Sequence, residues 1–541
     1  MARKWWTLIA VVVGVFMLLL DVTIVNVALP DIQKSFDASL SDLQWVLDAY
    51  ALALAAGLLT AGSLADRYGR RALFVVGTVI FTTGSLLCGL ATGPMFLNLA
   101  RGGQGIGGAI MFATSLALLT DAFRGKDRGV AFGVFGAVTG IAVAVGPVLG
   151  GLITSGLSWR WIFLVNIPIG VAAVAVTLLR VNESRDPDAA RLDWAGLVTF
   201  TGGLAALVYG LISSADGWGE TKVVVSLAFA ALLLVAFGVV EAVQRRPMLD
   251  LSLFRKPTFS GGLIAAFAIS ASLFSLLTYV VLYLQNQLGF SALDTGLRTL
   301  FLTGAIFLTA GIAGRLTTVV PVRVMISAGF VLIGTGLLLM HGVTTTSGWT
   351  HLIPGLILAG VGAGLVNVPL ASTAVGVVEP ARAGMASGIN ATLRQVGIAT
   401  GIATLGSLFS AQIRDTVTDR LRQSPLAPQA HQIADGIGGG AFGGGSGGAG
   451  GPGGEQGRRI IGSAARAGFV DGLNEILLVG AGIALVAAVT SLLLIRGRDF
   501  VEEPDADSPP ASGTASGTES GTAPNGAGAP GASGTPQPSH S

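Results

Sequence analysis

Residues 8–29 read LIAVVVGVFMLLLDVTIVNVAL, a nearly continuous apolar run. About 20 apolar residues cross the hydrocarbon core of a bilayer as one helix, so this run predicts a spanning helix. Its only ionisable residue is Asp21. A carboxylate inside a membrane costs about 2.5–3.5 kcal/mol on insertion scales, and such residues usually face a water-filled or ligand-binding interior. We therefore interpret Asp21 as functional, the alternative being a structural aspartate bonded to Thr23 or Asn26 of its own helix.

The composition of the whole chain agrees with that helix. The 541 residues are 52% hydrophobic and only 11% charged, with a mean hydropathy of +0.72, whereas soluble proteins carry about 25% charged residues. We predict an all-α polytopic membrane protein. The net charge of +2 does not indicate a nucleic-acid partner, because the basic residues lie in predicted loops. The single cysteine, Cys88, excludes an intrachain disulfide, and the four histidines lack metal-ligand spacing, so no metal site is expected.

Fourteen spanning helices are predicted, and an even number places both termini on one side of the membrane. Lys and Arg residues number 20 on the segments that share the side of the N-terminus and 4 in the short loops and helix entrances of the other side. Positive residues gather on the cytoplasmic side, so both termini are predicted to be cytoplasmic in a bacterial plasma (inner) membrane. The predicted spans are 7–29, 43–62, 72–92, 96–119, 129–153, 160–180, 194–214, 222–242, 259–284, 295–314, 321–341, 351–376, 385–410 and 471–495.

A glycine pattern repeats along the chain at a spacing of 255 residues. Six glycines of the first half recur in the second half, which is more than chance alignment gives. We therefore infer a duplication that makes helices 1–6 and helices 9–14 two parallel six-helix repeats, with helices 7 and 8 inserted. Secondary transporters built from such repeats place their site between the halves at mid-membrane. The glycines are 105, 107, 129, 133, 146 and 151, which recur at 360, 362, 384, 388, 401 and 406.

These patterns divide the chain into four predicted parts. Residues 1–180 form the N-terminal half, 181–258 hold the two inserted helices with their linkers, and 259–501 form the C-terminal half. Residues 411–470 of that half are predicted to be an external loop, whose glycine-rich centre has the composition of a flexible linker. Residues 502–541 are rich in Pro, Gly, Ser, Ala and Thr and hold too few apolar residues to fold, so they predict a disordered cytoplasmic tail.

Four motifs carry a resemblance to a known family. They are GSLADRYGRR at 62–71, ARGGQGIGGA at 100–109, GAVTGIAVAVGPVLGG at 136–151 and LDVTIVNVALP at 20–30. Together with fourteen helices, they resemble the major facilitator superfamily, in its fourteen-helix drug:proton antiporter branch of the EmrB/QacA type. The resemblance implies proton-driven export, and its helix 5 motif is found in drug exporters and is weak or absent in importers.

The loop between helices 2 and 3 is expected to act in gating. Its glycines permit a tight turn, its aspartate can interact with donors at a helix end of the opposite half, and its arginines hold the loop at the anionic cytoplasmic surface. The alternative is a basic loop that serves topology alone. The candidate gating residues are Gly62, Asp66, Arg67, Gly69, Arg70 and Arg71.

Helix 5 is expected to hold a hinge at the interface between the halves. Its small residues keep one face flat, and its proline bends the helix. Residue chemistry alone leaves generic small-residue packing as an equal alternative, and the resemblance favours the antiporter hinge. The residues are Gly136, Gly140, Gly146, Pro147, Gly150 and Gly151.

Three charged residues share one depth in the first half. At 1.5 Å per residue, Asp21 lies about 12 Å from the outer end of its helix, while Arg101 and Asp48 each lie about 8 Å from theirs. A carboxyl group buried alone tends to keep its proton, and a nearby arginine favours its ionised form. A motion that changes the Asp21–Arg101 distance would therefore load or release a proton. Asp48 is either a further proton site or a solvated interfacial residue. Arg394, near the midplane, is either a pairing or a structural residue.

Substrate contacts are harder to predict. In the superfamily that the motifs resemble, the first and fourth helices of each half line the cavity, which here are helices 1, 4, 9 and 12. Aromatic faces suit flat or cationic amphiphiles, although lipid-facing or packing roles explain each aromatic equally well. The candidates are Phe274, Tyr279, Tyr283, Asn367 and Arg394.

The sequence therefore predicts proton-coupled export of amphipathic drugs or antibiotics by a monomer in the lipid bilayer, with no cofactor besides the proton gradient. Self-resistance of an antibiotic producer is one hypothesis within it. The alternatives are an exporter of an endogenous lipid or metabolite and a proton-coupled solute importer. An enzyme is not expected, because catalytic clusters are missing. ATP drive is not expected either, since the only Gly-Lys pair, Gly125–Lys126, is followed by Asp127.

Overall fold

The structure is a computed structural model. It describes residues 2–123, 126–185, 193–214, 217–244, 249, 251–317, 319–378, 383–440 and 454–500. Regular structure in these ranges is helical throughout. Thirteen described helices are long and apolar enough to cross a membrane, and predicted span 43–62 falls in a further helix of 29 residues. Each of the fourteen predicted spans thus lies on one helix or on a run of consecutive helical segments, which confirms the fold class.

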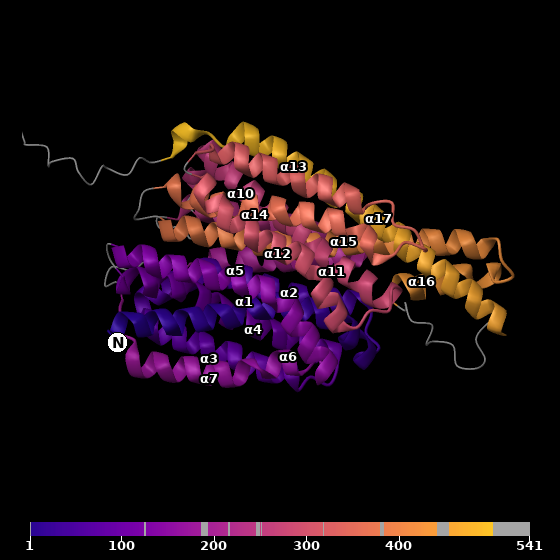
Figure 1. The fold of residues 1–541 in the computed structure, drawn as a ribbon, viewed down its shortest axis with the longest axis horizontal. Helices are drawn as coiled ribbons and strands as arrows, with labels where there is room; N and C mark the ends of the chain where they lie inside the picture. Colours follow the sequence, from indigo (N-terminus) through magenta and orange to yellow (C-terminus); the bar gives the residue numbers. More distant parts are fainter. Residues whose placement is uncertain are drawn as a thin grey trace, which may run out of the picture. The chain divides into compact units, whose positions relative to one another are not determined.

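The first part of the chain forms one bundle, drawn from indigo to magenta in Figure 1. Predicted helix 6 is divided in two, because α6 is a single turn that ends just before α7. The helices are α1 (Arg3–Phe36), α2 (Leu40–Tyr68), α3 (Arg70–Gly89), α4 (Pro94–Ala122), α5 (Lys126–Gly156), α6 (Trp161–Leu164) and α7 (Asn166–Arg180), followed by the inserted helices α8 (Trp194–Ser213) and α9 (Thr221–Val243).

The rest of the described chain forms a second bundle beside the first (Figure 1). Predicted helix 9 is continuous through α10 and α11, but it contains two π-helical segments, Ser270–Phe274 and Tyr283–Gln287. The helices are α10 (Pro257–Ile269), α11 (Ser275–Leu282), α12 (Ala292–Leu316), α13 (Val322–Met340), α14 (Ile353–Gly376), α15 (Ala383–Arg422), α16 (Ala430–Gly438) and α17 (Gly454–Leu494).

The same helix pairs recur in both bundles. α4 packs against α2 and α3, and α14 packs against α12 and α13 in the same way. The repeated glycines explain the correspondence, because each allows a close approach. A Cβ atom on Gly105 would lie 2.5 Å from the carbonyl oxygen of Tyr50, and one on Gly360 would lie 2.5 Å from that of Leu302. The duplication inferred from glycine spacing is therefore visible as a repeated packing contact.

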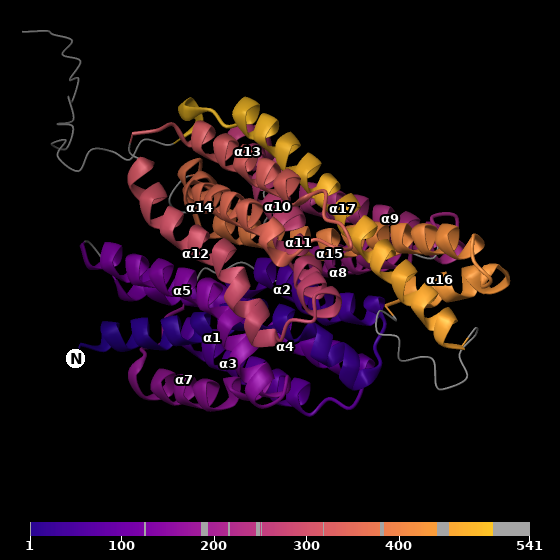
Figure 2. The same cartoon turned by 45° about the vertical axis from the view of Figure 1, so that its right-hand side comes forward.

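The two bundles meet along two seams, in which α5 packs against α12 and α2 packs against α15. The inserted helix α8 packs against both α2 and α15. At the end of α8, the hydroxyl groups of Ser214 and Ser407 lie 2.6 Å apart and share a hydrogen bond. The inserted helix α8 therefore covers the second seam, and α9 packs on α8. Figure 2 shows α8 and α9 on the same side as α15.

The prediction that residues 411–470 form a loop is wrong over much of its length. α15 continues to Arg422, α17 begins at Gly454, and α16 lies between them. Ile413, Val417 and Leu421 follow at four-residue spacing and are fully buried. This spacing gives an amphipathic helix whose apolar stripe packs on α17, which a search for continuous apolar runs does not detect. The centre of the predicted linker, 441–453, lies outside the described residues, as does the predicted tail 502–541.

We call the end of the bundles where α1 begins and α17 ends the terminal face, and the opposite end, which carries α16, the loop face (Figure 1). At the loop face the second bundle reaches over to the first. The side-chain amide of Gln33 donates to the carbonyl oxygen of Gly440 at 2.8 Å. The backbone N–H of Leu40 donates to the carbonyl oxygen of Gly439 at 2.7 Å. These bonds join the end of α1 and the start of α2 to the segment that follows α16.

Candidate transport site

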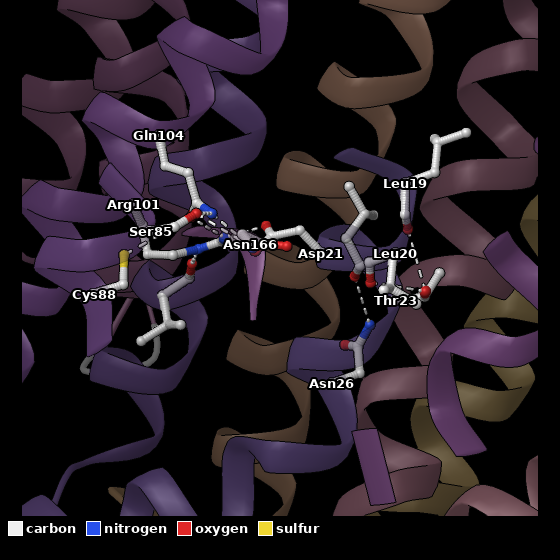
Figure 3. A network of polar contacts seen from close by, with 12 residues as sticks. Leu19, Leu20, Asp21, Thr23, Asn26, Ser85, Cys88, Arg101, Gln104 and Asn166 are labelled. Atoms are coloured by element: carbon white, nitrogen blue, oxygen red, sulfur yellow. Dashed lines mark hydrogen bonds and ion pairs between the residues drawn. The ribbon is translucent and has the colours of Figure 1, made fainter. Parts of the chain in front are cut away.

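Asp21 lies at the centre of a buried polar network, shown in Figure 3. Arg101 Nη1 donates to Asp21 Oδ2 at 2.5 Å, and Gln104 Nε2 donates to Asp21 Oδ1 at 2.8 Å. Gln104 Nε2 also donates to Ser85 Oγ at 2.8 Å, and Asn166 Nδ2 donates to the same hydroxyl at 3.2 Å. Both oxygens of the carboxylate therefore have donors, from a network that joins α1, α3, α4 and α7.

The guanidinium group of Arg101 also has contacts besides its ion pair with Asp21. Its Nε donates to the carbonyl oxygen of Val46 at 3.0 Å, and its Cζ lies 4.1 Å from the ring centroid of Tyr50. The side chains of Asp21 and Arg101 are 0% and 1% exposed. A buried ion pair is stable only when further hydrogen bonds satisfy both members. This pair meets that requirement, and its charges cancel.

Asp48 has a different environment. It is 0% exposed, and both oxygens of its carboxyl group lack a hydrogen-bond partner among the residues that the structure describes. One turn earlier on α2, Gln44 Nε2 donates to the carbonyl oxygen of Ile402 at 3.1 Å, and the hydroxyl of Tyr279 donates to the same oxygen at 2.8 Å. Asp48 therefore lies one helical turn from a contact between the bundles.

A cavity of about 70 Å³ lies between the two bundles. A buried water needs about 10–15 Å³ of such space, so the cavity has room for several waters but not for a drug-sized molecule. Most of its lining is apolar, with hydroxyl and amide groups between. It is lined by Val22, Thr23, Asn26, Val27, Leu47, Tyr50, Ala51, Arg101, Val143, Pro147, Phe274, Leu277, Thr278, Val281, Thr299, Leu302, Thr303, Ile306, Gln395, Ile398 and Ile402.

Only one of the five substrate-contact candidates lines this cavity. It is Phe274, which ends the first π-helical segment. Single-turn π segments are frequent at functional sites, and this one precedes the cavity residues Leu277 and Thr278. Tyr279 and Tyr283 are buried away from it: the ring of Tyr279 packs 5.3 Å from that of Phe409, and Tyr283 donates to the backbone at 3.3 Å. Burial of their rings between helices explains both positions.

Asn367 and Arg394 form a pair outside the cavity lining. Arg394 Nη2 donates to Asn367 Oδ1 at 2.6 Å, which joins α15 to α14. The two residues were predicted independently, and the structure brings them together. Arg394 lies next to Gln395 and one turn before Ile398, which both line the cavity. The pair therefore lies beside the cavity on the side of the terminal face, where α15 begins.

Two glycines of the helix 5 motif bring α5 against α1. A Cβ atom on Gly150 would lie 2.7 Å from Ile24 Cγ1 and 2.9 Å from the carbonyl oxygen of that residue. A Cβ atom on Gly146 would collide with Thr23. Pro147, between them, lies inside the helix and lines the cavity. This face of α5 is therefore fitted to the part of α1 that carries Asp21.

The other motif glycines lie along the seam with α12. A Cβ atom on Gly151 would lie 2.6 Å from Leu293 Cα, and one on Gly140 would lie 3.6 Å from Phe307. Toward the terminal face, a Cβ atom on Gly136 of α5 or on Gly311 of α12 would meet no atom of another helix within 4 Å in the described structure. The seam is therefore tight near the loop face and loose near the terminal face. Figure 2 shows α5 and α12 separating in that direction.

The predicted gating loop makes a sharp turn at Gly69, whose φ of +109° favours glycine. The carboxylate of Glu183 then accepts hydrogen bonds from the backbone N–H groups of Arg71 and Ala72, each at 3.0 Å. The backbone N–H of Arg70 donates to the carbonyl oxygen of Ser184 at 2.8 Å. An acidic side chain thus caps the N-terminus of α3, as the helix dipole favours.

The arginines of this loop contact the first bundle. Arg70 lies 3.8 Å from the carboxylate of Asp121, and Arg71 donates to the carbonyl oxygen of Val181 at 3.2 Å. Arg67 is exposed and lies over the ring of Tyr68. Gly62 and the side chain of Asp66 lie outside the part of the chain whose side chains are described, so the expected contact of Asp66 with the opposite half stays a prediction.

Comparison with known proteins identifies the fold. The family model of the Major Facilitator Superfamily matches residues 11–402. The chain belongs to this superfamily. It is therefore a multi-span membrane transporter and not an enzyme, as the motifs predicted.

Its relatives agree over most of their length. The chain is 38% identical over 432 residues to the multidrug resistance protein Stp of Mycobacterium tuberculosis. The aligned residues cover 79% of this chain and 80% of Stp. It is 32% identical over 512 residues to the tetracenomycin C resistance and export protein of Streptomyces glaucescens, and the aligned residues cover 94% of this chain and 95% of that protein. A solved auto-inhibited peptide transporter of the POT family has the same fold, with a TM-score of 0.59, 15% identity and coverage of 93% and 98%.

The structure adds cavity residues that the sequence analysis missed. Asn26 was considered only as a partner of Asp21, but its side-chain oxygen accepts from Thr278 at 2.9 Å across the two bundles. α2, α5, α12 and α15 line the cavity more than α4 does, and α14 contributes no residue to its lining. Polar residues at one-turn spacing in an apolar helix, such as Thr299 and Thr303, are the signal that would have found this face.

Proposed function

We propose that the chain exports amphipathic drugs or antibiotics in exchange for protons. Two observations support export: Stp is named for multidrug resistance and the Streptomyces relative for tetracenomycin C export. The Lys and Arg bias supports a cytoplasmic terminal face in a bacterial plasma membrane. The mostly apolar lining of the cavity between the bundles suits an amphipathic substrate once the bundles move apart and widen it.

The observation that carries proton coupling is the unpartnered carboxyl group of Asp48. An ionised carboxylate that is buried without partners costs several kcal/mol, so Asp48 holds a proton in this conformation. Its neighbours Leu47, Tyr50 and Ala51 line the cavity. A substrate that enters the cavity displaces these neighbours, admits water to Asp48 and releases the proton to the cytoplasm.

The Asp21–Arg101 pair has the positioning role. Both members of the pair are satisfied by hydrogen bonds, which hold Arg101 in a fixed position. Arg101 lines the cavity and stacks on Tyr50, two residues from Asp48. A shift of α4 relative to α2 moves a fixed positive charge toward or away from Asp48, and this favours loss or uptake of its proton.

The seam between α5 and α12 supplies the motion. Its glycine contacts are tight near the loop face and absent near the terminal face in the described residues. Substrate enters between these helices from the cytoplasm. Release to the outside then requires the seam to open near the loop face, where the bonds of Gln33 and Leu40 to the segment after α16 must break.

The test is substrate-induced proton release from purified full-length protein, measured with a pH dye in weakly buffered detergent. Tetracenomycin C is a suitable first substrate. Wild type should release protons on binding, and Asp48→Asn should bind without release. Asp37→Asn, which changes an exposed carboxylate at the loop face, is the matched control and should release protons as wild type does. Undiminished release from Asp48→Asn, together with loss in Asp21→Asn, would transfer the proton site to Asp21.

A further inference from the structure

The second bundle holds an arginine without a carboxylate partner among the described residues. Arg394 lies inside α15 and is half-buried, and the side-chain oxygen of Asn367 is its one hydrogen-bond partner among the described residues. A guanidinium group has five N–H donors. Most of these donors therefore have no acceptor in the described structure. Arg101, by contrast, has a carboxylate, an amide oxygen and a backbone carbonyl.

A second donor lies on the same face of α15. Asn390 precedes Arg394 by four residues, so the two side chains lie one above the other on the helix. Asn390 is 8% exposed, and its side-chain nitrogen has no partner in the described part of the chain. A buried amide nitrogen without an acceptor costs about 1–3 kcal/mol. Two unsatisfied donors at one-turn spacing are the arrangement that an anion would complete.

The charges beside the cavity point the same way. The charges of Asp21 and Arg101 cancel, and Asp48 is neutral while it holds its proton. Arg394 then leaves one positive charge beside the cavity. Ile398, one turn away, and Gln395 line the cavity and connect it to this charge.

We propose that Arg394 and Asn390 bind the carboxylate of an amphipathic anionic substrate, whose apolar body lies against Phe274 and Leu277 once the bundles move apart and widen the cavity. Asn367 positions the guanidinium group by accepting one of its hydrogen bonds. Arginine suits this role because its planar donor pairs match a carboxylate. The inference rests on the proposed export function and adds the substrate class to it.

The probes are 2-naphthoate and its uncharged methyl ester, which share one apolar body. Binding is measured by calorimetry on purified full-length protein, without a proton gradient, in nanodiscs of zwitterionic lipid. Wild type should bind the anion more tightly than the ester. Arg394→Gln should weaken anion binding about 10- to 100-fold, the value of a charged hydrogen-bonded contact, and should change ester binding little.

A second variant guards against misfolding of the first. Asn367→Asp keeps Arg394 but places a carboxylate against it, so anion binding should fall to the level of ester binding. Arg298→Gln, which alters an arginine already paired with Asp294 on α12, is the matched control and should bind as wild type. Equal affinity of wild type for both probes, or unchanged anion binding in both Arg394→Gln and Asn367→Asp, would overturn the proposal.

Two further arms separate the alternatives. Competition of 2-naphthoate by phosphatidylglycerol added to the nanodiscs would assign the donors to a lipid headgroup and also overturn the proposal. Proton release is read separately: loss of release in Asp48→Asn with normal 2-naphthoate binding supports both proposals. Normal release with tetracenomycin C in Arg394→Gln, with loss of anion binding, shows that the anion site is distinct from the proton site.

Discussion

Asp21 and Asp48 lie on neighbouring helices of one bundle, and both are fully buried, yet their surroundings are opposite. Asp21 receives hydrogen bonds from Arg101 and Gln104 on its two oxygens, and Asp48 receives none from the described residues. The first environment supplies donors to both carboxylate oxygens, and the second leaves the carboxyl group without a donor among the described residues. Two acids at similar depth in the membrane can therefore have opposite hydrogen-bonding environments, and we predict that these partners decide which of the two exchanges a proton.

The largest expected effect comes from removing the partner of Asp21. Arg101→Ala leaves an ionised carboxylate buried without its counter-charge, so the free energy of unfolding should fall by about 3–5 kcal/mol. Unfolding in mixed detergent and SDS micelles measures this change. The double variant Asp21→Asn/Arg101→Gln should recover part of the loss, since it leaves no uncompensated charge. A loss of unfolding free energy below about 1 kcal/mol in Arg101→Ala would show that the ion pair contributes little to stability. Asp21 would then depend on a partner no more than Asp48 does.

A smaller effect is expected for Gln104. Gln104→Leu removes the donor to Asp21 Oδ1 and leaves Ser85 with the weaker bond from Asn166. The expected loss is about 1–3 kcal/mol, the cost of leaving buried groups unsatisfied. The same unfolding titration measures it, and Gln44→Leu on α2 is a control that leaves the network intact. Equal stability of Gln104→Leu and wild type would mean that Asp21 depends on Arg101 alone.

The sequence predicted the parts of this molecule that local patterns determine. Long apolar runs gave the spanning helices, and glycines at fixed spacing gave the repeat, because close helix packing needs small residues wherever it recurs. The shared depth of Asp21 and Arg101 followed from helix geometry alone. The amphipathic extension to Arg422 was missed, because its apolar residues form a stripe and not a run.

The partners of single side chains could not be predicted in this way. Phe274 and Tyr279 lie five residues apart on the same continuous helix. Phe274 ends a π-helical segment of that helix, in which the angular spacing between residues differs from that of an α-helix. Only Phe274 faces the cavity. Similarly, the sequence offered Asp48 as a possible proton site without showing that its oxygens lack partners. Rotation of helices about their axes decides both cases, and it is set by packing between the bundles.

The smallest effect on stability is expected at Asp48, and it tests the comparison most directly. A protonated carboxyl group and an amide have nearly the same shape, so Asp48→Asn should change the free energy of unfolding by less than about 1 kcal/mol. Asp21→Asn has the same change in chemistry, but it deprives Arg101 of its counter-charge and should destabilise the protein clearly more. Both variants are compared in one unfolding titration with wild type. Equal destabilisation by the two would show that Asp48 is ionised and paired in the native state. Unchanged stability of Asp48→Asn would leave the loss of proton release as the effect of this substitution. That result is expected of a residue whose function is to gain and lose a proton.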